Sequence, residues 1–430
     1  MQNLIDWKNS PTRKPLILEW ARQVWKTYIL KEFWKKYFKN MIYINFQNPS
    51  NGILELFKWT LDPKKIIKTL SLIYGEDILP QDTLLFFDEI QATPRALESL
   101  KYFCEDTPEY AVVTAWSLLG VFLHPGTSFP VGKVQTLELY PLDFEEYLWA
   151  NWKKQIVDEL KKDPFISLFD DSLYELFKEY LFLWWMPAVV KNWLENHLVS
   201  EVETLQEQIL KDYQWDFSKY TDKSVSLRIL EIFKTIAPQL GKENWKFIYN
   251  LIRTWARARE YEQAVERLVE AGLTKKVYNT DVGNKIPLRG YINMHNFKLY
   301  FLDVWLLRKL ANIPYIVIQN KDQIFNEFNG MLTEQFVLQQ LSQYELFYWT
   351  LWKSEVDFIM QRDNIIIPIE VKSGTNLRAK SLINFKDKYH PVVATRFSLQ
   401  KTEIKDWLIE ISLYKSFLFD EIINQFLNKE

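Results

Sequence analysis

The chain has 430 residues, of which 48% are hydrophobic and 25% charged, and its formal net charge at pH 7 is −2. This composition excludes a disordered chain and predicts a globular protein of two or three domains, while the low net charge excludes a general attraction to nucleic acid. One cysteine, Cys104, excludes an internal disulfide. Residues 1–6 lack a signal-peptide pattern and no apolar run is long enough for a bilayer, which predicts a cytoplasmic protein without a membrane partner.

Residues 15–140 alternate short β-rich runs with helical patterns. This alternation predicts a parallel sheet that carries helices on both faces. Continuous apolar runs such as residues 84–87 fit strands that are buried on both sides. The predicted strands are residues 15–19, 41–45, 83–88, 110–114 and 134–139, and the predicted helices are residues 27–38, 63–74 and 94–105.

The segment after the first predicted strand matches a phosphate-binding loop, G-x-x-x-x-G-K-[ST], with tryptophan in place of each glycine. Lys26 and Thr27 stand where that motif needs a cation for the β- and γ-phosphates and a hydroxyl for Mg²⁺. An indole at either glycine position would fill the space of the phosphates, because backbone N–H groups must wrap closely around them. The candidate ATP-binding residues are Trp20, Ala21, Arg22, Gln23, Val24, Trp25, Lys26 and Thr27.

The glycine content suggests a cause for these tryptophans. Average usage predicts about 30 glycines in a chain of this length. This chain has 11 glycines and 18 tryptophans, which together come to 29. Some bacterial lineages read the codon UGA as glycine, whereas a common alternative translation table reads it as tryptophan. We therefore hypothesise that many of these tryptophans are glycines in the native protein; the alternatives are a truly tryptophan-rich protein or a pseudo-ATPase.

Two further strand ends complete the predicted nucleotide site. The apolar run 84–87 ends in Asp88 and Glu89, at the edge of an open α/β sheet where ligands bind. Asp88 is suited to hold Mg²⁺, and Glu89 is suited to orient and deprotonate the attacking water. Ser117 follows the next strand and is either a sensor of the γ-phosphate or the N-cap of a following helix. Trp116 stands where a tight turn would favour glycine.

The middle of the chain is predicted to be helical to about residue 220 and then to resemble a winged helix-turn-helix. Arg257 and Arg259, at the start of its third helix, could contact DNA phosphates. Four glutamates on the same helix would repel phosphate, which favours a structural or packing role and leaves DNA a weakly indicated partner. The predicted helices are residues 226–239, 244–256 and 261–271, followed by β-like residues 273–279 and 287–292.

Near the C-terminus, acids and a lysine fall on predicted strands. Glu370 and Lys372 point to the same side of one strand because successive side chains alternate faces. Asp357 lies on the strand before it, and Glu334 on the preceding helix. This set resembles the D…E-x-K signature of restriction-endonuclease-like, PD-(D/E)xK nucleases, which hold Mg²⁺ with two carboxylates and use the lysine to position or activate water. The alternative is an inactive fold that keeps a salt-bridged cluster of acids and lysine. The predicted strands are residues 347–350, 355–361, 365–371 and 392–397, with helices at 333–343 and 378–388.

Motifs along nearly the whole chain resemble a prokaryotic family of AAA-type ATP-binding proteins that carry a C-terminal domain of unknown function with a nuclease-like fold. Eight tryptophans stand where the family pattern has glycine, whereas Trp149 and Trp349 look like ordinary tryptophans. The matching motifs are residues 21–24, 87–91, 117–120, 140–146 and 333–337. The eight departures are Trp20, Trp25, Trp116, Trp184, Trp185, Trp255, Trp305 and Trp352.

The fold class that follows is an α/β P-loop NTPase of the AAA type, then a helical and winged-helix region, then an α/β restriction-endonuclease-like domain. The leading prediction of function is ATP binding and Mg²⁺-dependent hydrolysis when positions 20 and 25 are glycine. The alternatives are a non-hydrolysing scaffold, if Trp20 and Trp25 are genuine, and a Mg²⁺-dependent DNA nuclease with regulatory ATP binding. The resemblance also allows a homo-oligomer or a protein partner. The predicted domains are 1–142, the ATPase core; 143–222, a helical connector; 223–295, winged-helix-like; and 296–430, nuclease-like.

Overall fold

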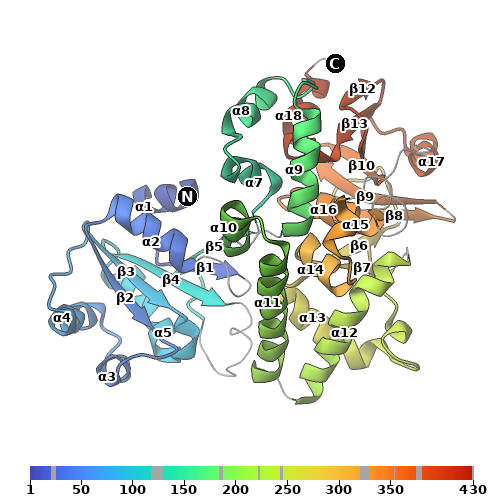
Figure 1. Ribbon diagram of the computed structural model, residues 1–430. Coiled ribbons are helices and arrows are strands. Elements are labelled where there is room, and N and C mark those ends of the chain that lie inside the picture. Colours follow the sequence, from blue (N-terminus) through green and yellow to red (C-terminus); the bar gives the residue numbers. More distant parts are fainter. Residues whose placement is uncertain are drawn as a thin grey trace. The chain divides into compact units, whose positions relative to one another are not determined.

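The computed structural model describes residues 1–20, 26–117, 129–140, 142–183, 187–220, 223–242, 246–319, 329–352, 354–373 and 380–428 (Figure 1). The chain divides into two compact units. Unit 1 consists of Met1–Tyr140, Trp215–Asp222 and Glu270–Gly272, and unit 2 of Pro141–Gln214, Lys223–Val269 and Leu273–Glu430. Among the described residues, no helix combines the length and the apolar character that crossing a membrane would need.

Unit 1 is built on a five-stranded sheet of order β2-β3-β4-β1-β5. All four neighbouring pairs are parallel, so the predicted parallel sheet is confirmed. In this order β4 lies between β1 and β3, which places the carboxyl ends of these three strands side by side. The strands are β1 (Leu16–Trp20), β2 (Asn40–Asn45), β3 (Thr83–Asp88), β4 (Ala111–Ser117) and β5 (Gln135–Glu138).

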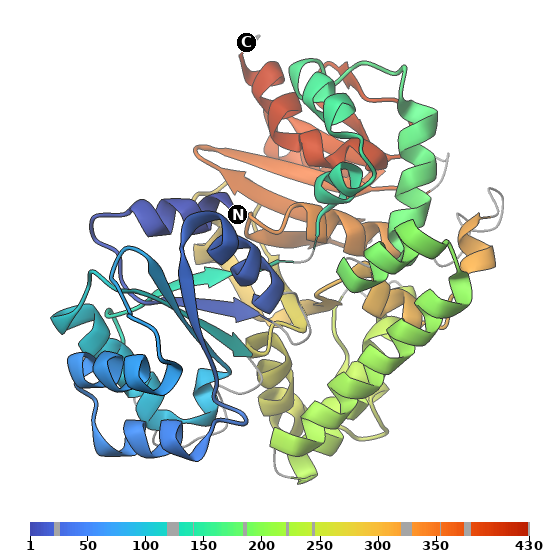
Figure 2. The ribbon, with the colours of Figure 1, turned by 60° about the vertical axis from the view of Figure 1, so that its left-hand side comes forward.

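Helices cover both faces of this sheet, as predicted (Figure 2). Every residue of β3 is buried, and its side chains alternate between two hydrophobic cores. Leu85 and Phe87 pack with residues of α3, α4 and α5, while Leu84 and Phe86 pack with residues of α1 and α2. The short helices α1 and α3 were not predicted. The helices are α1 (Gln2–Asn9), α2 (Lys26–Tyr37), α3 (Asn51–Trp59), α4 (Pro63–Tyr74) and α5 (Pro94–Asp106), with a 3₁₀ turn, η1 (Ile90–Ala92).

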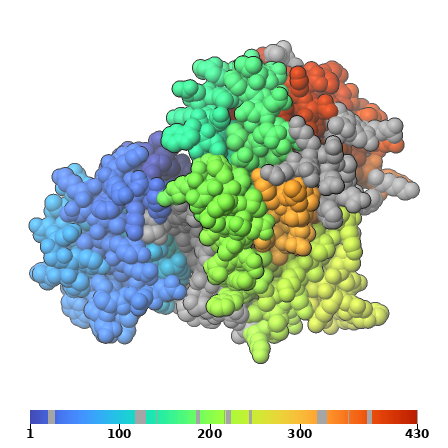
Figure 3. Space-filling view, viewed as in Figure 1, coloured from blue at the N-terminus to red at the C-terminus, as the bar shows by residue number. Residues whose placement is uncertain are grey.

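Unit 2 begins with the predicted helical region, whose helices form much of the surface that faces the viewer in Figure 3. Its centre is an eight-stranded mixed sheet of order β12-β13-β11-β10-β9-β8-β6-β7. The helices are α7 (Phe144–Ala150), α8 (Lys154–Lys162), α9 (Asp170–Leu183), α10 (Pro187–Asn196), α11 (Val199–Tyr220), α12 (Lys223–Gly241), α13 (Ala258–Glu270), α14 (Val304–Leu310), α15 (Tyr315–Gln319), α16 (Asn329–Gln340), α17 (Lys380–Tyr389) and α18 (Phe419–Leu427). The 3₁₀ turns are η2 (Tyr249–Leu251), η3 (Leu288–Tyr291) and η4 (Leu413–Leu418). The strands are β6 (Thr274–Thr280), β7 (Ile292–Phe301), β8 (Leu346–Leu351), β9 (Ser354–Arg362), β10 (Ile365–Val371), β11 (Ala394–Ser398), β12 (Glu403–Lys405) and β13 (Leu408–Ser412).

The arrangement does not support the predicted winged-helix region. Of its three helices, α12 and α13 form, but within the described part of the middle stretch only the single turn η2 is helical. The left-handed φ of 70° at Trp255 separates this turn from α13, because a right-handed helix cannot continue through such a residue. The β-like segments are also not a separate wing, since β6 pairs with β7 and with β8 and so belongs to the large sheet.

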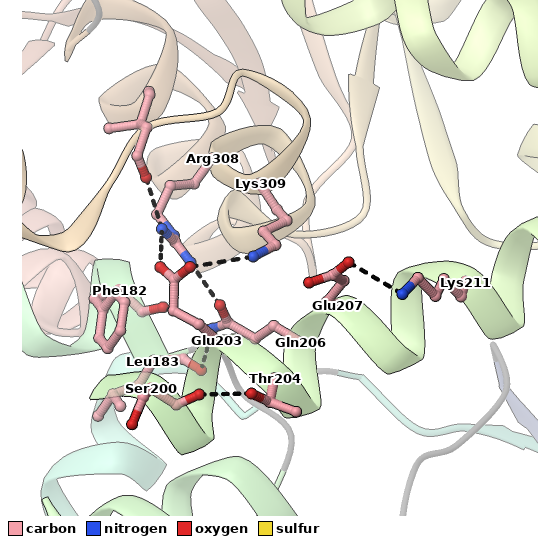
Figure 4. Close-up of polar contacts among 11 residues, drawn as sticks. Phe182, Leu183, Ser200, Glu203, Thr204, Gln206, Glu207, Lys211, Arg308 and Lys309 are labelled. Carbon is pink, nitrogen blue, oxygen red and sulfur yellow. Dashed lines mark hydrogen bonds and ion pairs between the residues drawn. The ribbon is translucent and has the colours of Figure 1, made fainter. Parts of the chain in front are cut away.

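A buried arginine fastens α11 to α14 and to the end of α9 within unit 2 (Figure 4). The side chain of Arg308 is 1% exposed and donates hydrogen bonds to the carbonyl oxygen of Ile313 at 2.7 Å and to Gln206 Oε1 at 2.5 Å. Its guanidinium also lies 3.5 Å from a carboxylate oxygen of Glu203 and stacks on the ring of Phe182. Burial lowers the pKa of Arg308 to about 10, against the opposing effect of Glu203. The two terminal nitrogens of the guanidinium therefore connect these helices.

Gln206 extends this contact because its amide nitrogen donates to the carbonyl oxygens of Phe182 and Leu183, each at 3.0 Å. Lys309 reaches the same Glu203 at 3.3 Å, but its side chain is more exposed than that of Arg308. Arg308 and Lys309 thus share the carboxylate of Glu203 and differ mainly in burial. Variants of the two residues can therefore be compared to measure how much the buried contact contributes to the free energy of unfolding.

We expect Arg308→Met to lower the free energy of unfolding by about 3 kcal/mol, because it leaves buried acceptors on Gln206 and Ile313 without a donor. Lys309→Met should cost no more than about 1 kcal/mol, as is usual for a partly exposed ion pair. Denaturant unfolding of the two variants measures the difference. Equal losses in both variants would show that the buried network does not fasten these helices.

Candidate functional site

The carboxyl edge of the unit 1 sheet brings together the strand ends that the sequence marked for nucleotide binding. In the strand register Trp20 is paired with Ser117, and Asp88 is paired with Ala115. Lys26 is the first residue of α2, so the motif has the strand before it and the helix after it that a phosphate loop requires. Helix N-termini attract phosphate because their first N–H groups point outward without partners in the helix.

Part of this predicted site lies outside the residues that the structure describes. The described strand β1 ends at Trp20 and α2 begins at Lys26, so only the framework on either side of the loop is seen. Of Trp20, Lys26, Thr27 and Ser117 the structure describes the backbone and not the side chain. The loop residues outside the description are Ala21, Arg22, Gln23, Val24 and Trp25.

Asp88 is buried at the end of β3 and accepts a hydrogen bond from the hydroxyl of Tyr43 on β2 at 2.8 Å. Burial, together with this hydrogen bond and the charge of Asp88, raises the pKa of Tyr43 to about 12. The phenol therefore keeps its proton at neutral pH and acts as a donor that orients the carboxylate. Tyr43 was not singled out in the sequence, where its only signal is its place two residues before the end of the neighbouring strand.

Glu89 adopts a left-handed backbone conformation, with φ 52° and ψ 41°. Its backbone N–H donates to the carbonyl oxygen of Ala115 at 3.0 Å, which fixes the residue against the adjacent strand. The amide nitrogen of Gln91 donates a hydrogen bond to the Glu89 carboxylate. Non-glycine residues with positive φ are uncommon, and strained backbone of this kind clusters at functional sites. Gln91, also missed in the sequence, thus positions the candidate base.

Lys133 is a surface residue and not part of this edge. Its Nζ lies 2.8 Å from Glu105 Oε1, and both side chains are substantially exposed. This ion pair with Glu105 accounts for the charge of the lysine.

One group of tryptophans behaves as expected for the residue type. The indole N–H of Trp7 donates to the carbonyl oxygen of Lys14 at 2.8 Å, and the ring is buried. Trp349 is also buried, packs between Phe385 and Tyr389, and donates to the Tyr389 hydroxyl at 3.3 Å. Buried indoles normally find such a partner. The prediction that Trp349 is an ordinary tryptophan fits this environment.

A second group has the backbone of glycine. Trp152, Trp255 and Trp352 have φ angles of 60°, 70° and 55° and are 93%, 85% and 88% exposed. A bulky residue at positive φ is a genuine outlier, whereas glycine adopts this region at no steric cost. Their rings gain almost nothing from packing in return. Trp255 and Trp352 are two of the eight positions expected to be glycine, and Trp152 was not among them.

Each of these three residues occupies a turn position that ordinarily selects glycine. Trp152 follows α7, and the backbone bonds from Trp152 N to Trp149 O and from Lys153 N to Leu148 O close a Schellman motif, whose left-handed residue is usually glycine. Trp352 opens the two-residue hairpin loop between β8 and β9, where Leu351 pairs with Ser354.

Trp255 precedes Ala256, whose N–H closes a turn on the carbonyl oxygen of Arg253 at 3.1 Å. Positive φ at the third position of such a turn again favours glycine. The local hydrogen bonding therefore supports the hypothesis that native glycines stand at these positions.

Two further suspect positions, Trp116 and Trp305, do not share this backbone. Trp116 lies inside β4, which continues through residue 117, so the prediction of a tight turn at this residue is wrong. Its ring is buried, but the indole nitrogen has no hydrogen-bond partner among the described residues. Trp305 is fully buried in α14. Trp184 and Trp185 lie outside the described residues.

In unit 2 the structure brings the predicted acids and lysine together. Lys372 Nζ lies 2.5 Å from Glu370 Oε1, and the backbone N–H of Val371 donates to Asp357 Oδ2 at 2.7 Å. Asp357 is on β9 and Glu370 on β10, and these strands are antiparallel neighbours. Glu334 on α16 accepts a hydrogen bond from the Tyr300 hydroxyl at 2.9 Å.

The same place contains two charged residues that the sequence did not reveal, Lys298 on β7 and Glu355 on β9. Lys298 is 6% exposed, forms an ion pair with Glu355, and lies 3.8 Å from Glu334. We call Lys298, Glu334, Glu355, Asp357, Glu370 and Lys372 the C-terminal cluster. Burial raises the pKa of Glu355 and of Glu370, and raises that of Asp357 well above its usual range. Across the described part of the chain, no group of three or more His, Cys, Asp or Glu side chains is arranged to hold a metal ion.

Comparison with known proteins supports an AAA-type, ATP-binding first part of the chain. Residues 12–148 match the family model of an AAA domain, and residues 174–315 and 329–414 match two domains of unknown function, DUF8612 and DUF4143. A solved structure, the Walker-type ATPase PABY2304 of Pyrococcus abyssi, is 14% identical with a TM-score of 0.44; the alignment covers 73% of this chain and 95% of that chain. No curated protein matches the chain. An AAA domain implies a site for ATP and Mg²⁺ in general.

We expect Trp152→Gly to raise the free energy of unfolding by about 1 kcal/mol, because glycine relieves the cost of a left-handed residue. Trp149→Gly is the matched control, since Trp149 lies three residues earlier, within α7, and is 44% exposed. Glycine inside a helix should lower stability by about 1 kcal/mol. Denaturant unfolding of both variants gives the two signs. A loss of stability in Trp152→Gly would mean that the indole itself is needed there.

Proposed function

We propose that the protein hydrolyses ATP with Mg²⁺ at the carboxyl edge of the five-stranded sheet, with glycine at positions 20 and 25 in the native chain. The observation that carries this proposal is the parallel register that aligns the ends of β1, β3 and β4. This register puts the end of β1, after which the predicted loop begins, beside the ends of β3 and β4. The match of this region to an AAA domain agrees with the proposal.

The proposed roles follow from the chemistry of each side chain. Lys26 would neutralise charge on the β- and γ-phosphates, and Thr27 and Asp88 would complete the Mg²⁺ shell. Ser117 would contact the γ-phosphate from the neighbouring strand. Glu89 would accept the proton of the attacking water. When bound, Mg²⁺ would offset the charge that develops on the transferred phosphoryl group.

Gln91 has a defined part in this proposal. Its amide donates to the Glu89 carboxylate and so fixes the direction of the group that would accept the proton of the attacking water. The backbone hydrogen bond from Glu89 to Ala115 fixes the residue beside β4. The hydrogen bond from Gln91 fixes the direction of its carboxylate.

The proposed organisation around this site has three parts. The ATPase core spans residues 1–142 and a helical connector spans residues 143–222. The C-terminal part has a nuclease-like arrangement in which Glu334, Asp357, Glu370 and Lys372 converge. This convergence supports a nuclease-like fold. We do not extend the proposal to DNA cleavage, because each of these carboxylates already has a protein partner.

Peptide mass sequencing of the native protein tests the premise first. Peptides that cover residues 15–27 should carry glycine at positions 20 and 25, and glycine should also appear at positions 152, 255 and 352. Tryptophan at 20 and 25 would block the phosphate loop and leave the non-hydrolysing scaffold as the better interpretation. That scaffold would bind no ATP either as written or with both glycines restored.

Hydrolysis is tested in the chain that has glycine at positions 20 and 25. We expect Glu89→Gln to lower kcat by at least about 100-fold, the usual range for loss of a general base, while ATP affinity changes little. Glu76→Gln, on the exposed turn after α4, is the control and should leave kcat unchanged. Steady-state phosphate release and ATP titration measure the two quantities. An unaltered kcat in Glu89→Gln would remove this residue from the mechanism.

A further inference from the structure

The C-terminal cluster contains four carboxylates and two lysines from four different elements. Glu355 and Asp357 come from β9, Glu370 from β10 and Glu334 from α16. Lys298 comes from β7, and Lys372 follows β10 directly. The nuclease-like resemblance implies Mg²⁺ among these acids, so the fit of a metal ion can be judged from the contacts that they make.

One oxygen of each of three carboxylates is already engaged by a donor of the protein. Mg²⁺ requires six oxygen ligands at about 2.0–2.1 Å in nearly octahedral geometry. Glu370 Oε1 instead faces Lys372 at 2.5 Å, and Asp357 Oδ2 accepts from the backbone of Val371 at 2.7 Å. Glu334 Oε2 accepts from the Tyr300 hydroxyl at 2.9 Å. This agrees with the absence, among the described side chains, of any acidic group arranged for a metal ion.

Lys298 supplies a positive charge within the cluster. Its side chain is nearly as buried as the carboxylate of Glu370, forms an ion pair with Glu355, and lies 3.8 Å from Glu334. Alternation along β7 puts Lys298 and Tyr300 on the same face, where both meet Glu334. The ring of Tyr348 lies 5.5 Å from the ammonium. A buried ammonium is costly unless it is paired, so its position is determined by these acids.

The carboxylates of the cluster also repel one another, which adds to the need for a resident cation. Burial raises the pKa of Asp357 well above its usual range, and the negative charges of Glu370 and Glu334 raise it further. Glu370 Oε2 is buried and has no hydrogen-bond partner among the described residues, while Glu370 Oε1 is paired with Lys372.

We propose that the C-terminal cluster is neutralised from within by Lys298, which stands in for a divalent cation, so that the domain keeps a nuclease-like arrangement without a metal site. This inference does not rest on ATP hydrolysis in unit 1. It predicts that the cluster binds no divalent cation until Lys298 is removed. The two lysines also differ in exposure, which separates the buried Lys298 from the more accessible Lys372.

Mn²⁺ binding to the full chain, measured by electron paramagnetic resonance without nucleotide, tests the first part. The unsubstituted chain and the double variant Asp357→Asn/Glu370→Gln should bind the same amount of Mn²⁺, because any Mn²⁺ held in unit 1 is common to both. A bound ion that disappears in the double variant would overturn the proposal. So would plasmid nicking with Mn²⁺ that requires both Asp357 and Lys372.

Removal of the resident cation tests the second part. Lys298→Met should lower Tm by several degrees, and Mn²⁺ at millimolar concentration should raise the Tm of this variant but not that of the unsubstituted chain. Lys405→Met, which removes an exposed ion pair with Glu403 on β12, is the control and should leave Tm within about one degree.

The double variant Lys298→Met/Glu355→Gln keeps the test decisive if Lys298→Met alone does not fold. Removing both members of a buried pair costs much less than removing one. We therefore expect the double variant to fold and to recover most of the lost Tm. A double variant as unstable as Lys298→Met would show that Lys298 does not serve to neutralise Glu355, and would overturn the proposal.

Discussion

The parallel pairing of β4 with both β1 and β3 is the constraint on which the nucleotide site depends. It fixes three carboxyl strand ends at one edge, so that residues 20, 88 and 117 become neighbours although the chain separates them widely. The two hydrophobic cores hold this register, because alternate side chains of β3 belong to opposite cores and a shift by one residue would exchange them. Tyr43 and Gln91 then refine the directions of the two acids at this edge.

Much of unit 1 could be predicted from the sequence, since buried parallel strands read as continuous apolar runs and α4 carries both a start and a stop signal. Asp62 caps its first turn, Pro63 begins it, and Gly75 ends it with φ 68°. The short α1 and α3 lack such length and were missed. In unit 2 the sequence indicated β6, β8, β9, β10 and β11, but β12 and β13 were missed, and the predicted strand 287–292 reaches only the first residue of β7. The predicted wing is part of the large sheet, since β6 pairs with both β7 and β8, and Lys298 on β7 contacts Glu355 on β9. That pairing is tertiary, and no local pattern encodes it.

Backbone conformation distinguishes the tryptophans at glycine-like positions from the other tryptophans more clearly than burial does. Trp116 and Trp305 are accommodated in the cores, so packing alone gives no reason to doubt them. Trp152, Trp255 and Trp352 have no packing to offset a left-handed φ, and the hydrogen bonds of their turns require that φ whatever the side chain is. A turn position of this kind requires a positive φ, whereas the sequence composition only suggests that glycines are missing. The two arguments are independent, and both lead to glycine.

The two acidic sites of this protein differ in what accompanies the carboxylates. At the edge of the unit 1 sheet, Asp88 receives a hydrogen bond from Tyr43, a phenol that keeps its proton and so orients the acid without cancelling its charge. In the C-terminal cluster, Lys298 and Lys372 cancel charge directly, and burial favours protonated acids. Binding of a divalent cation there would therefore have to displace the ammonium of Lys298, which is anchored on β7. The carboxylates are thus accompanied by a neutral donor at one site and by cations at the other.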